Sequence, residues 1–557
     1  MTYIAVFFIS LFLTIFFTPY LISYLKSEGI LDKPEERKVH KESTPRMGGL
    51  VIFIVFIIIL FSFYTELNGI RFMIMGMIII TICGVIDDII GLKWSIKFIV
   101  QFLAALFLIL FLSPYYDRIT IFGILLPSGL DMIVLFLFIV GVINSVNLMD
   151  GMDGLVSGFA LMVFITTMAL SIYKTDEMVM LFSVSLAGAL FGFLKFNAYP
   201  ARIFLGDTGS LFLGFVIVML SLKISVGYNK GNLSLGFPIL LLAVPILDTL
   251  KVMIKRITSG KNPFLADNNH LHHIIFYNRI RHKTTVFFIQ ILALCFMILA
   301  IYYLKSKSLY VIPVFILLAL IMGYSHLIFQ KLNLTDFLKK QYEVISKIPS
   351  VLIQKYSLFL LGISSITIIF ILLNSIKLSG VKFAGNESIF LIISGVLTFV
   401  LAYAHNRKSG TINHIYFFLN IVVFFFITHS NSILMPNLTT RVFFGTDYFL
   451  ITSYIVLVAV ILLFLMAKDR IIPKEDILFS GIDLTMIVVI ALGFIVTTFL
   501  SNTIFVLLSE SLLVGFIMYL WYKIVGYVRP VLVNYLFYGS FLVPMLFLIY
   551  IITMGSF

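Results

Sequence analysis

The chain has 557 residues, of which 61% are hydrophobic and 12% charged, and its formal net charge at pH 7 is +13. Because a soluble domain carries roughly a quarter charged residues, this composition excludes an ordinary soluble protein and predicts a polytopic membrane protein. The basic residues are spread over short loops, which favours a positive-inside bias over binding to nucleic acid.

Long apolar runs recur along the whole chain and predict an all-α membrane protein with about eighteen transmembrane helices. A run of about 17–25 apolar residues is long enough to cross roughly 30 Å of hydrocarbon. The first run is too long for the core of a signal peptide and is interpreted as a retained helix. The predicted spans are 3–25, 48–64, 71–88, 96–113, 129–146, 154–173, 178–194, 208–226, 234–254, 285–304, 309–329, 351–373, 386–404, 411–428, 447–467, 480–500, 502–522 and 530–553.

The distribution of basic residues predicts the orientation of these spans. With the amino terminus outside, the loops that fall inside hold most of the 39 Lys and Arg residues, and the bias alternates to the end of the chain. The two cysteines, Cys83 and Cys295, lie within apolar runs, so neither a disulfide framework nor a cysteine zinc site is expected.

A polar segment divides the chain into two parts. Residues 331–350 are mixed in charge and predict a cytoplasmic linker between eleven spans in 1–330 and seven in 351–557. In the second part the most unusual residue is Glu510, because an acid in mid-span is costly and often functional. A glutamate hydrogen-bonded inside the helix bundle is the plainer interpretation. We expect the second part to be a membrane module for assembly, stability or product handling.

Two polar strings follow the first and third predicted spans, on the inner side. The loop 32–49 carries Lys41 among other basic residues, which suits a polyphosphate, although an ordinary positive-inside loop has the same composition. Asp87 and Asp88 close the third span, and such a pair at membrane depth usually faces a cavity, a cation or a proton path. A solvated helix end is the alternative. Lys97 lies on a helix face that can look toward this pair.

The next two inner strings are rich in acids and amides. Asn147 lies near the end of the fifth predicted span, and Asp-Gly steps at Asp150 and Asp153 then form a tight, acid-lined turn. A plain turn between helices is the alternative, but three acids or amides are more than a turn needs. Asp207 stands directly before the eighth span, where a carboxylate can cap the helix or hold a cation over a diphosphate.

The fifth string contains three histidines, His270, His272 and His273, after Asp248 and Arg256. Such a cluster could suggest zinc, but the usual i, i+4 helical pair is absent and no cysteine accompanies it. Imidazoles that donate to phosphate beside Arg256 fit better, and a solvated histidine-rich loop is the alternative. No GxGxxG, Walker A or GxSxG motif occurs, so a nucleotide is not expected to bind in a soluble Rossmann or P-loop manner.

These five strings, in this order and at predicted inner helix ends, resemble the polyprenyl-phosphate N-acetylhexosamine-1-phosphate transferase family over about residues 1–330. The resemblance implies that a sugar 1-phosphate passes from a UDP-sugar to undecaprenyl phosphate with release of UMP. It also implies Mg²⁺ as the cofactor, with Mn²⁺ as a substitute. The form His270-Leu-His272-His273 resembles the branch that uses UDP-N-acetylglucosamine for teichoic acid, O-antigen or related polymers. Asn268 departs from the arginine that is common there.

The resemblance implies a role for each matching residue. Asp207 and Asp150 would hold the metal ion, Asp87 would orient the lipid phosphate or act as its base, and Asp88 would be its partner. Phe204 would stack on uracil. The contacts with nucleotide, phosphates and sugar would come from Lys41, Asn147, Asp150, Asp153, Asn197, Phe204, Arg256, His270, His272 and His273. Little base strength is needed, because a phosphomonoester with a second pKa of about 6 is largely ionised at pH 7.

The implied location is the inner (plasma) membrane, with the active site of a multi-pass chain facing the cytoplasm. Two alternatives stay open: a phospho-MurNAc-pentapeptide transferase of the same family, and a transporter or flippase of lipid-linked sugars. Carriers tend to place polar residues near the bilayer midplane, whereas these acids lie at inner helix ends, which favours interfacial chemistry. A homodimer is compatible with the sequence but not required by it.

Overall fold

The computed structural model describes residues 2–32, 43–226, 231–260, 270–277, 282–325 and 485–493. The chain divides into two compact units, and the described residues belong to the first, which comprises 1–334 and 479–500. The second unit lies outside the described residues, as do Lys41, Asn268, Glu510 and the segment 331–350. The expectations for those positions stay predictions.

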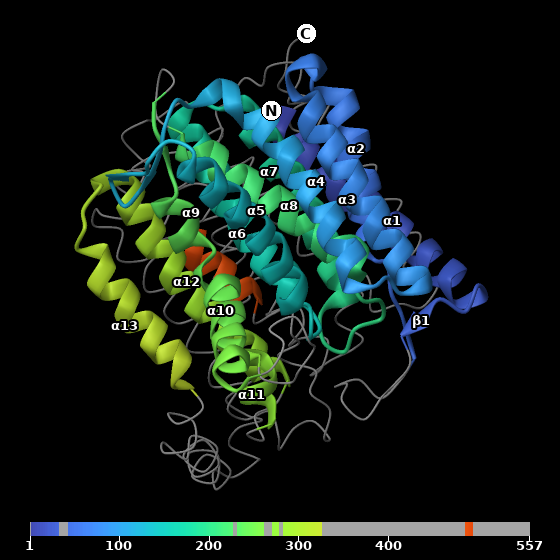
Figure 1. The fold of residues 1–557 in the computed structure, drawn as a ribbon. Helices are drawn as coiled ribbons and strands as arrows, with labels where there is room; N and C mark the ends of the chain where they lie inside the picture. Colours follow the sequence, from blue (N-terminus) through green and yellow to red (C-terminus); the bar gives the residue numbers. More distant parts are fainter. Residues whose placement is uncertain are drawn as a thin grey trace, which may run out of the picture. The chain divides into compact units, whose positions relative to one another are not determined.

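The first unit is built almost entirely of helices, which Figure 1 labels in chain order. Their bounds are α1 Thr2–Ser27, α2 Gly49–Phe63, α3 Arg71–Ile90, α4 Trp94–Leu112, α5 Leu130–Met149, α6 Leu155–Lys174, α7 Glu177–Asn197, α8 Gly206–Ser225, α9 Gly236–Leu241, α10 Ala243–Thr258, α11 Leu271–Tyr277, α12 His282–Ser306 and α13 Val311–Gly323. Two 3₁₀ helices, η1 Leu67–Ile70 and η2 Ser113–Tyr115, adjoin α3 and α4. A further short helix covers 485–493.

Short strands tie the connecting loops together. β1 Leu31–Asp32 and β2 Thr44–Pro45 pair antiparallel, with Leu31 opposite Pro45. In the second sheet β3 Ile119–Ile121 is central, because it pairs antiparallel with β4 Ile124–Leu125 and parallel with β5 Leu233–Ser234. The parallel pair joins the loop after α4 to the chain that enters α9.

Eight of the described helices are long and apolar enough to cross a membrane, which confirms an all-α, multi-pass membrane protein. α2 and α13, with 15 and 13 residues, are shorter than the predicted spans. The prediction of one helix over 234–254 is wrong, because α9 ends and α10 begins around Leu242. Pro238 and Pro245 lie in the first turns of these two helices, where a missing N–H costs little. The count of eighteen spans and their orientation stay predictions.

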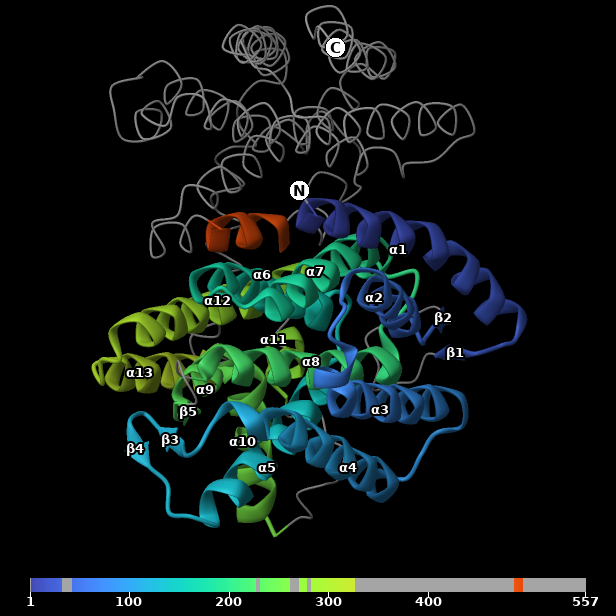
Figure 2. The ribbon, with the colours of Figure 1, turned by 90° about the horizontal axis from the view of Figure 1, so that it is seen from above.

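The centre of the unit is formed by α6, α7 and α8. Between 89% and 94% of the apolar windows of these helices is buried, because they are apolar on all sides and other helices surround them. α1 packs on α7, while α3 and α5 pack on α8 (Figure 2). The outer faces of α3, α4 and α5 expose large apolar side chains such as Ile86, Phe102 and Leu137, as expected where a protein meets lipid.

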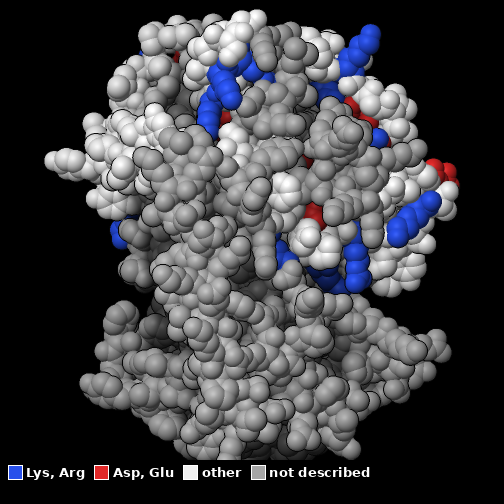
Figure 3. All heavy atoms as spheres, turned by 90° about the horizontal axis from the view of Figure 1, so that it is seen from below, with Lys and Arg blue, Asp and Glu red and all other residues white. Residues whose placement is uncertain are grey.

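One end of the helices carries a basic surface. Figure 3 views the molecule from the end at which β1 and α11 lie in Figure 1. Lys and Arg form the more extensive charged patches on this face, and Asp and Glu show only in small areas. A surface of this kind is typical of the cytoplasmic side of a membrane protein.

Candidate active site

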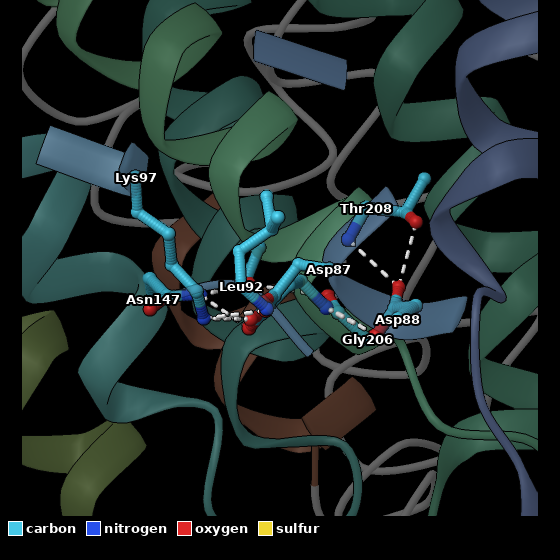
Figure 4. A network of polar contacts seen from close by, with 9 residues as sticks. Asp87, Asp88, Leu92, Lys97, Asn147, Gly206 and Thr208 are labelled. Carbon is cyan, nitrogen blue, oxygen red and sulfur yellow. Dashed lines mark hydrogen bonds and ion pairs between the residues drawn. The ribbon is translucent and has the colours of Figure 1, made fainter. Parts of the chain in front are cut away.

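Four helix ends meet where the polar strings of the sequence come together. The C-terminal ends of α3 and α5 and the N-terminal ends of α4 and α8 supply the side chains, and Figure 4 shows them converging. Glycines make this approach close: a Cβ on Gly49 would overlap the backbone of Gly209, and one on Gly84 would overlap the backbone of Thr208. Direct backbone contact between α2, α3 and α8 therefore holds the site together.

Asp87 closes α3 and stabilises the turn that leads into α4. Its backbone oxygen accepts a hydrogen bond from Gly91 N at 2.9 Å, and its Oδ1 accepts one from Leu92 N at 2.6 Å. Its Oδ2 forms an ion pair with Lys97 Nζ. Because Asp87 is only 7% exposed, its charge is compensated by these protein groups rather than by bulk water.

Lys97 bridges two carboxylates that come from different helices. Its Nζ contacts Asp87 Oδ2 and lies 2.6 Å from Asp207 Oδ2. The Lys97 and Asp207 side chains are 23% and 27% exposed, against 8% for Asp87, so the bridge is more accessible on the Asp207 side. The structure confirms that Lys97 looks toward Asp87. Sequence reasoning missed its bond to Asp207, because no short-range pattern links residues 110 positions apart.

Asn147 holds the other oxygen of Asp207. From the last turn of α5, its Nδ2 donates to Asp207 Oδ1 at 2.7 Å and to Ser210 Oγ at 2.9 Å. The Ser210 hydroxyl in turn donates to Gly206 O at 3.1 Å. The predicted residues Asn147 and Asp207 are thus brought together, and the carboxylate is oriented by an ammonium on one side and an amide on the other.

Asp88 caps helix α8 from outside that helix. Its Oδ1 accepts from Asp207 N at 3.1 Å, and its Oδ2 accepts from Thr208 N at 2.9 Å and Thr208 Oγ1 at 2.6 Å. Gly206 has φ +73°, and a Cβ there would collide with the Asp88 carboxylate. The sequence allowed Asp207 to be the cap, but no side-chain cap comes from within this helix. The carboxylate of Asp207 is therefore left free to face Lys97 and Asn147.

The acid-lined turn between α5 and α6 lies beside this cluster. Asp153 Oδ2 accepts from Ala201 N at 3.0 Å, which ties the turn to the loop before α8. Burial raises the pKa of Asp150 to about 8, and the negative charges of Asp88 and Asp153 act in the same direction. Asp150 is therefore largely protonated at neutral pH until a cation approaches it.

The histidines of the fifth string pack against the same turn. His270 Nδ1 lies 2.9 Å from Asp248 Oδ2, and Leu271 N donates to Asp248 Oδ1 at 2.7 Å, so one carboxylate on α10 anchors the start of α11. The His272 ring lies where a Cβ on Gly151 would be. Burial and the neighbouring histidines lower the pKa of His272 well below its usual value, so this imidazole is neutral at pH 7. His273 lies beside it, with ring centroids 4.3 Å apart.

Three further predicted residues serve the scaffold of the site in this structure. Asn197 is 4% exposed; its Oδ1 accepts from Ser157 Oγ at 2.7 Å and its Nδ2 donates to Ile203 O at 3.1 Å. The backbone of Phe204 donates to Pro45 O at 2.8 Å and accepts from Gly48 N at 2.9 Å. Arg256 is buried on α10. Their contacts with a substrate stay predictions, as do those of Lys41.

His282 is a neighbour of the site that the sequence did not single out. Its Nε2 accepts from Asp153 N at 3.3 Å, and its ring stacks on Tyr199 with centroids 4.4 Å apart. The only sequence signal was a histidine close to the start of a predicted span, and such residues are usually interfacial. The contact joins the beginning of α12 to the acid-lined turn.

The carboxylates of the site fit a magnesium ion that a phosphorylated ligand shares. Within the described part of the chain, no group of three or more His, Cys, Asp or Glu residues is arranged to hold a metal by itself. Mg²⁺ needs less from the protein, because it commonly takes one or two carboxylates together with phosphate and water oxygens. The Lys97 ammonium between Asp87 and Asp207 shows that a cation is accommodated at this point.

The helix ends that carry Asp87, Asn147 and Asp207 lie within a region of the chain that matches known proteins. The chain matches the model of glycosyl transferase family 4 over residues 70–225. A Bacillus subtilis (strain 168) protein, named probable undecaprenyl-phosphate N-acetylglucosaminyl 1-phosphate transferase, is 32% identical over 330 residues, which are 57% of this chain and 89% of the relative. A Thermotoga maritima protein, named undecaprenyl-phosphate alpha-N-acetylglucosaminyl 1-phosphate transferase, is 28% identical over 58% of this chain and 97% of its own. A Prochlorococcus marinus (strain MIT 9301) phospho-N-acetylmuramoyl-pentapeptide-transferase is 32% identical over 48% of this chain and 81% of its own.

Proposed function

Because the chain belongs to the polyprenyl-phosphate N-acetylhexosamine-1-phosphate transferase family, we propose that it transfers an N-acetylhexosamine 1-phosphate from a UDP-sugar to undecaprenyl phosphate and releases UMP. N-acetylglucosamine is the proposed sugar. The observation that carries the proposal is the pair of carboxylates, Asp87 and Asp207, bridged by Lys97 where four helix ends meet. With a divalent cation held by its carboxylates, such a site could balance charge while two anionic phosphates approach each other, which is the central difficulty of this reaction.

The proposed reaction exchanges one phosphorus–oxygen bond for another. An oxygen of the lipid phosphate attacks the sugar-bearing phosphorus of the donor, and the bond from that phosphorus to the oxygen of UMP breaks. Lys97 would neutralise the attacking phosphate and Asp87 would orient it, because their side chains are held at the α3–α4 turn. Asn147 would keep the Asp207 carboxylate aimed at the diphosphate. Asp88 would act by holding the start of α8, and with it Asp207, in place.

Mg²⁺, with Mn²⁺ as a substitute, would be held by Asp207 and Asp150 together with phosphate oxygens of the donor. When bound, it supplies a Lewis acid that screens the charge of the diphosphate. His272 would offer a neutral imidazole donor to the phosphates or the sugar, and His273 would lie beside it, since α11 packs on the acid-lined turn.

The direct test is release of UMP by membranes that contain the full chain and are supplied with UDP-N-acetylglucosamine, undecaprenyl phosphate and Mg²⁺. Asp207→Asn should reduce the rate at least about 100-fold, as is typical when a metal or transition-state contact is lost. Asp117→Asn, in an exposed loop, is the matched control and should retain the rate of the unmodified enzyme. Full activity of Asp207→Asn would remove the metal assignment.

A muramoyl-pentapeptide donor is the second candidate, because the Prochlorococcus marinus relative is also 32% identical, although over 292 residues rather than the 330 of the Bacillus subtilis match. A donor screen with purified enzyme separates the two. We expect UDP-N-acetylglucosamine to support UMP release and UDP-MurNAc-pentapeptide not to do so. The reverse result would reassign the enzyme within the family without changing the reaction class.

We propose that the site faces the cytoplasm from the plasma membrane and that the reaction begins an envelope polysaccharide such as O-antigen or teichoic acid. The basic surface at the same end of the helices supports this orientation (Figure 3). Labelling of a single cysteine placed in the exposed loop at Ser43 by a membrane-impermeant reagent would test it. Labelling in intact cells would contradict a cytoplasmic site, whereas labelling only after lysis would support one.

A further inference from the structure

A short helix from far along the chain is part of the first unit. Residues 479–500 group with 1–334 by their contacts, although the intervening residues 335–478 do not. Figures 1 and 2 both draw its described part, 485–493, in orange-red beside α6 and α12. The family match ends at residue 225, so this helix is a feature of the chain that the match does not explain.

Little of this helix is accessible to solvent. Val488, Val489 and Leu492 are at most 1% exposed, and Met486 and Ile490 are each 6% exposed. Apolar side chains on both sides of a short helix can be this inaccessible only if neighbours cover it from several directions. The helix is therefore closely covered by other parts of the chain.

A buried polar contact fixes the position of this helix along α12. Gln290 Nε2, on α12, donates to Thr485 Oγ1 at 3.1 Å. Gly158 on α6 makes room for the pair, because a Cβ there would overlap the Gln290 amide and lie 3.2 Å from Thr485 Cγ2. Gln290 is 1% exposed and Thr485 is 3% exposed, so water cannot readily replace this bond.

The contact also lies near the candidate active site. α12 begins at His282, about two helical turns before Gln290, and His282 accepts the hydrogen bond from the Asp153 backbone. Asp153, Tyr199, His282 and Thr485 line one small cavity. The beginning of α12 therefore connects Thr485 with the acid-lined turn.

We propose that the helix 485–493 is an integral element of the transferase unit, and that Thr485 is a positioning residue which, through Gln290 and α12, holds His282 against the Asp153 turn. The structural part of this proposal is independent of the reaction. The positioning part rests on the proposed function, because its consequence is better placement of a turn that contacts the donor.

Crosslinking of the full-length chain tests the structural part. The native cysteines are replaced by serine, Gln290 and Thr485 are each changed to Cys, and a protease site is placed within 331–350. A short thiol-specific crosslinker should keep the two fragments joined after cleavage. Thr284→Cys, on the exposed side of α12, paired with Thr485→Cys is the matched control and should not crosslink. Equal yields from both pairs, or none from the first pair, would overturn the placement.

Kinetics of point variants test the positioning part. Thr485→Val removes the hydroxyl and should raise the KM for the UDP-sugar about fivefold, as loss of one hydrogen bond of about 1 kcal/mol would. Thr485→Ser should restore the KM of the unmodified enzyme. Val489→Ala removes buried packing without a polar contact, so it should lower the melting temperature and leave KM unchanged. An unchanged KM in Thr485→Val, or the same increase in Val489→Ala, would refute positioning. If the unmodified enzyme releases no UMP, the proposed function fails while the crosslink still decides the structure.

Discussion

Lys97 is the residue whose removal should reveal most about the site. Lys97→Met keeps the length and apolar stem of the side chain but removes the cation between Asp87 and Asp207. At 2.6 Å and an effective dielectric constant of about 20, the attraction to one carboxylate is about 6 kcal/mol. Desolvation of the charges and competition from water offset most of this attraction, because Lys97 and Asp207 are each about a quarter exposed. A hydrogen bond to a charged group typically contributes about 1.5–3 kcal/mol net. A loss of about 2–3 kcal/mol corresponds to roughly a 30–150-fold lower kcat/KM.

The assay is the initial rate of UMP release by purified enzyme at saturating Mg²⁺, with both substrates varied. Lys93→Met is the matched control, because Lys93 is exposed one turn earlier and precedes the same helix. It should retain kcat/KM within about twofold of the unmodified enzyme. Lys97→Met with kcat/KM within threefold of the unmodified value would refute the view that the bridged carboxylates form the catalytic centre. Lys97→Arg should be intermediate, because a planar guanidinium keeps the charge but not the point contact with both carboxylates.

Three further predictions follow from the same cluster. Asp88→Ala removes the cap of α8 and should lower the free energy of unfolding by about 2 kcal/mol, whereas Thr208→Val should lower it by about 1 kcal/mol. Thermal unfolding in detergent measures both effects, and unchanged melting temperatures would contradict the capping role. The pKa of Asp150 is raised to about 8, so the folded state binds a proton more tightly than the unfolded state and loses stability as pH rises from about 4 to about 8. In the absence of divalent cations Asp150→Asn should therefore raise the melting temperature at pH 9 but not at pH 4, and an equal effect at both pH values would argue against that shift. A chelator should abolish UMP release and added Mg²⁺ or Mn²⁺ should restore it; activity that survives chelation would remove the metal from the mechanism.

The membrane character and the main polar residues were predictable from sequence because they depend on local signals. Apolar runs identified the helices, and helical periodicity predicted that the face with Lys97 looks toward the pair Asp87 and Asp88. The family assignment from five ordered strings was also correct.

Which aspartate caps α8 and which faces Lys97 and Asn147 was not predictable from sequence. Asp207 occupies a position where a side-chain cap is common, yet the cap comes from Asp88, more than a hundred residues away. Nothing in a local pattern reveals which of two distant carboxylates will meet a helix end. Hydropathy likewise could not divide 234–254 into α9 and α10, because an apolar window averages across the break at Leu242. Hydropathy also carries no information on contacts between distant segments, so the sequence did not predict that 479–500 groups with residues 1–334.

The glycines at the crossing of α2, α3 and α8 have a consequence for how such an enzyme can change its donor. Gly49, Gly84 and Gly209 allow backbone to rest on backbone, so the spacing between the helix with Asp87 and the helix with Asp207 does not depend on the size of any side chain. The crossing cannot widen to admit a bulkier sugar, nor narrow around a smaller one. Under the proposed function, we expect discrimination between donors to reside in the parts that side chains build, above all α11 and the acid-lined turn. New specificities can therefore evolve in those loops while the carboxylate geometry remains the same.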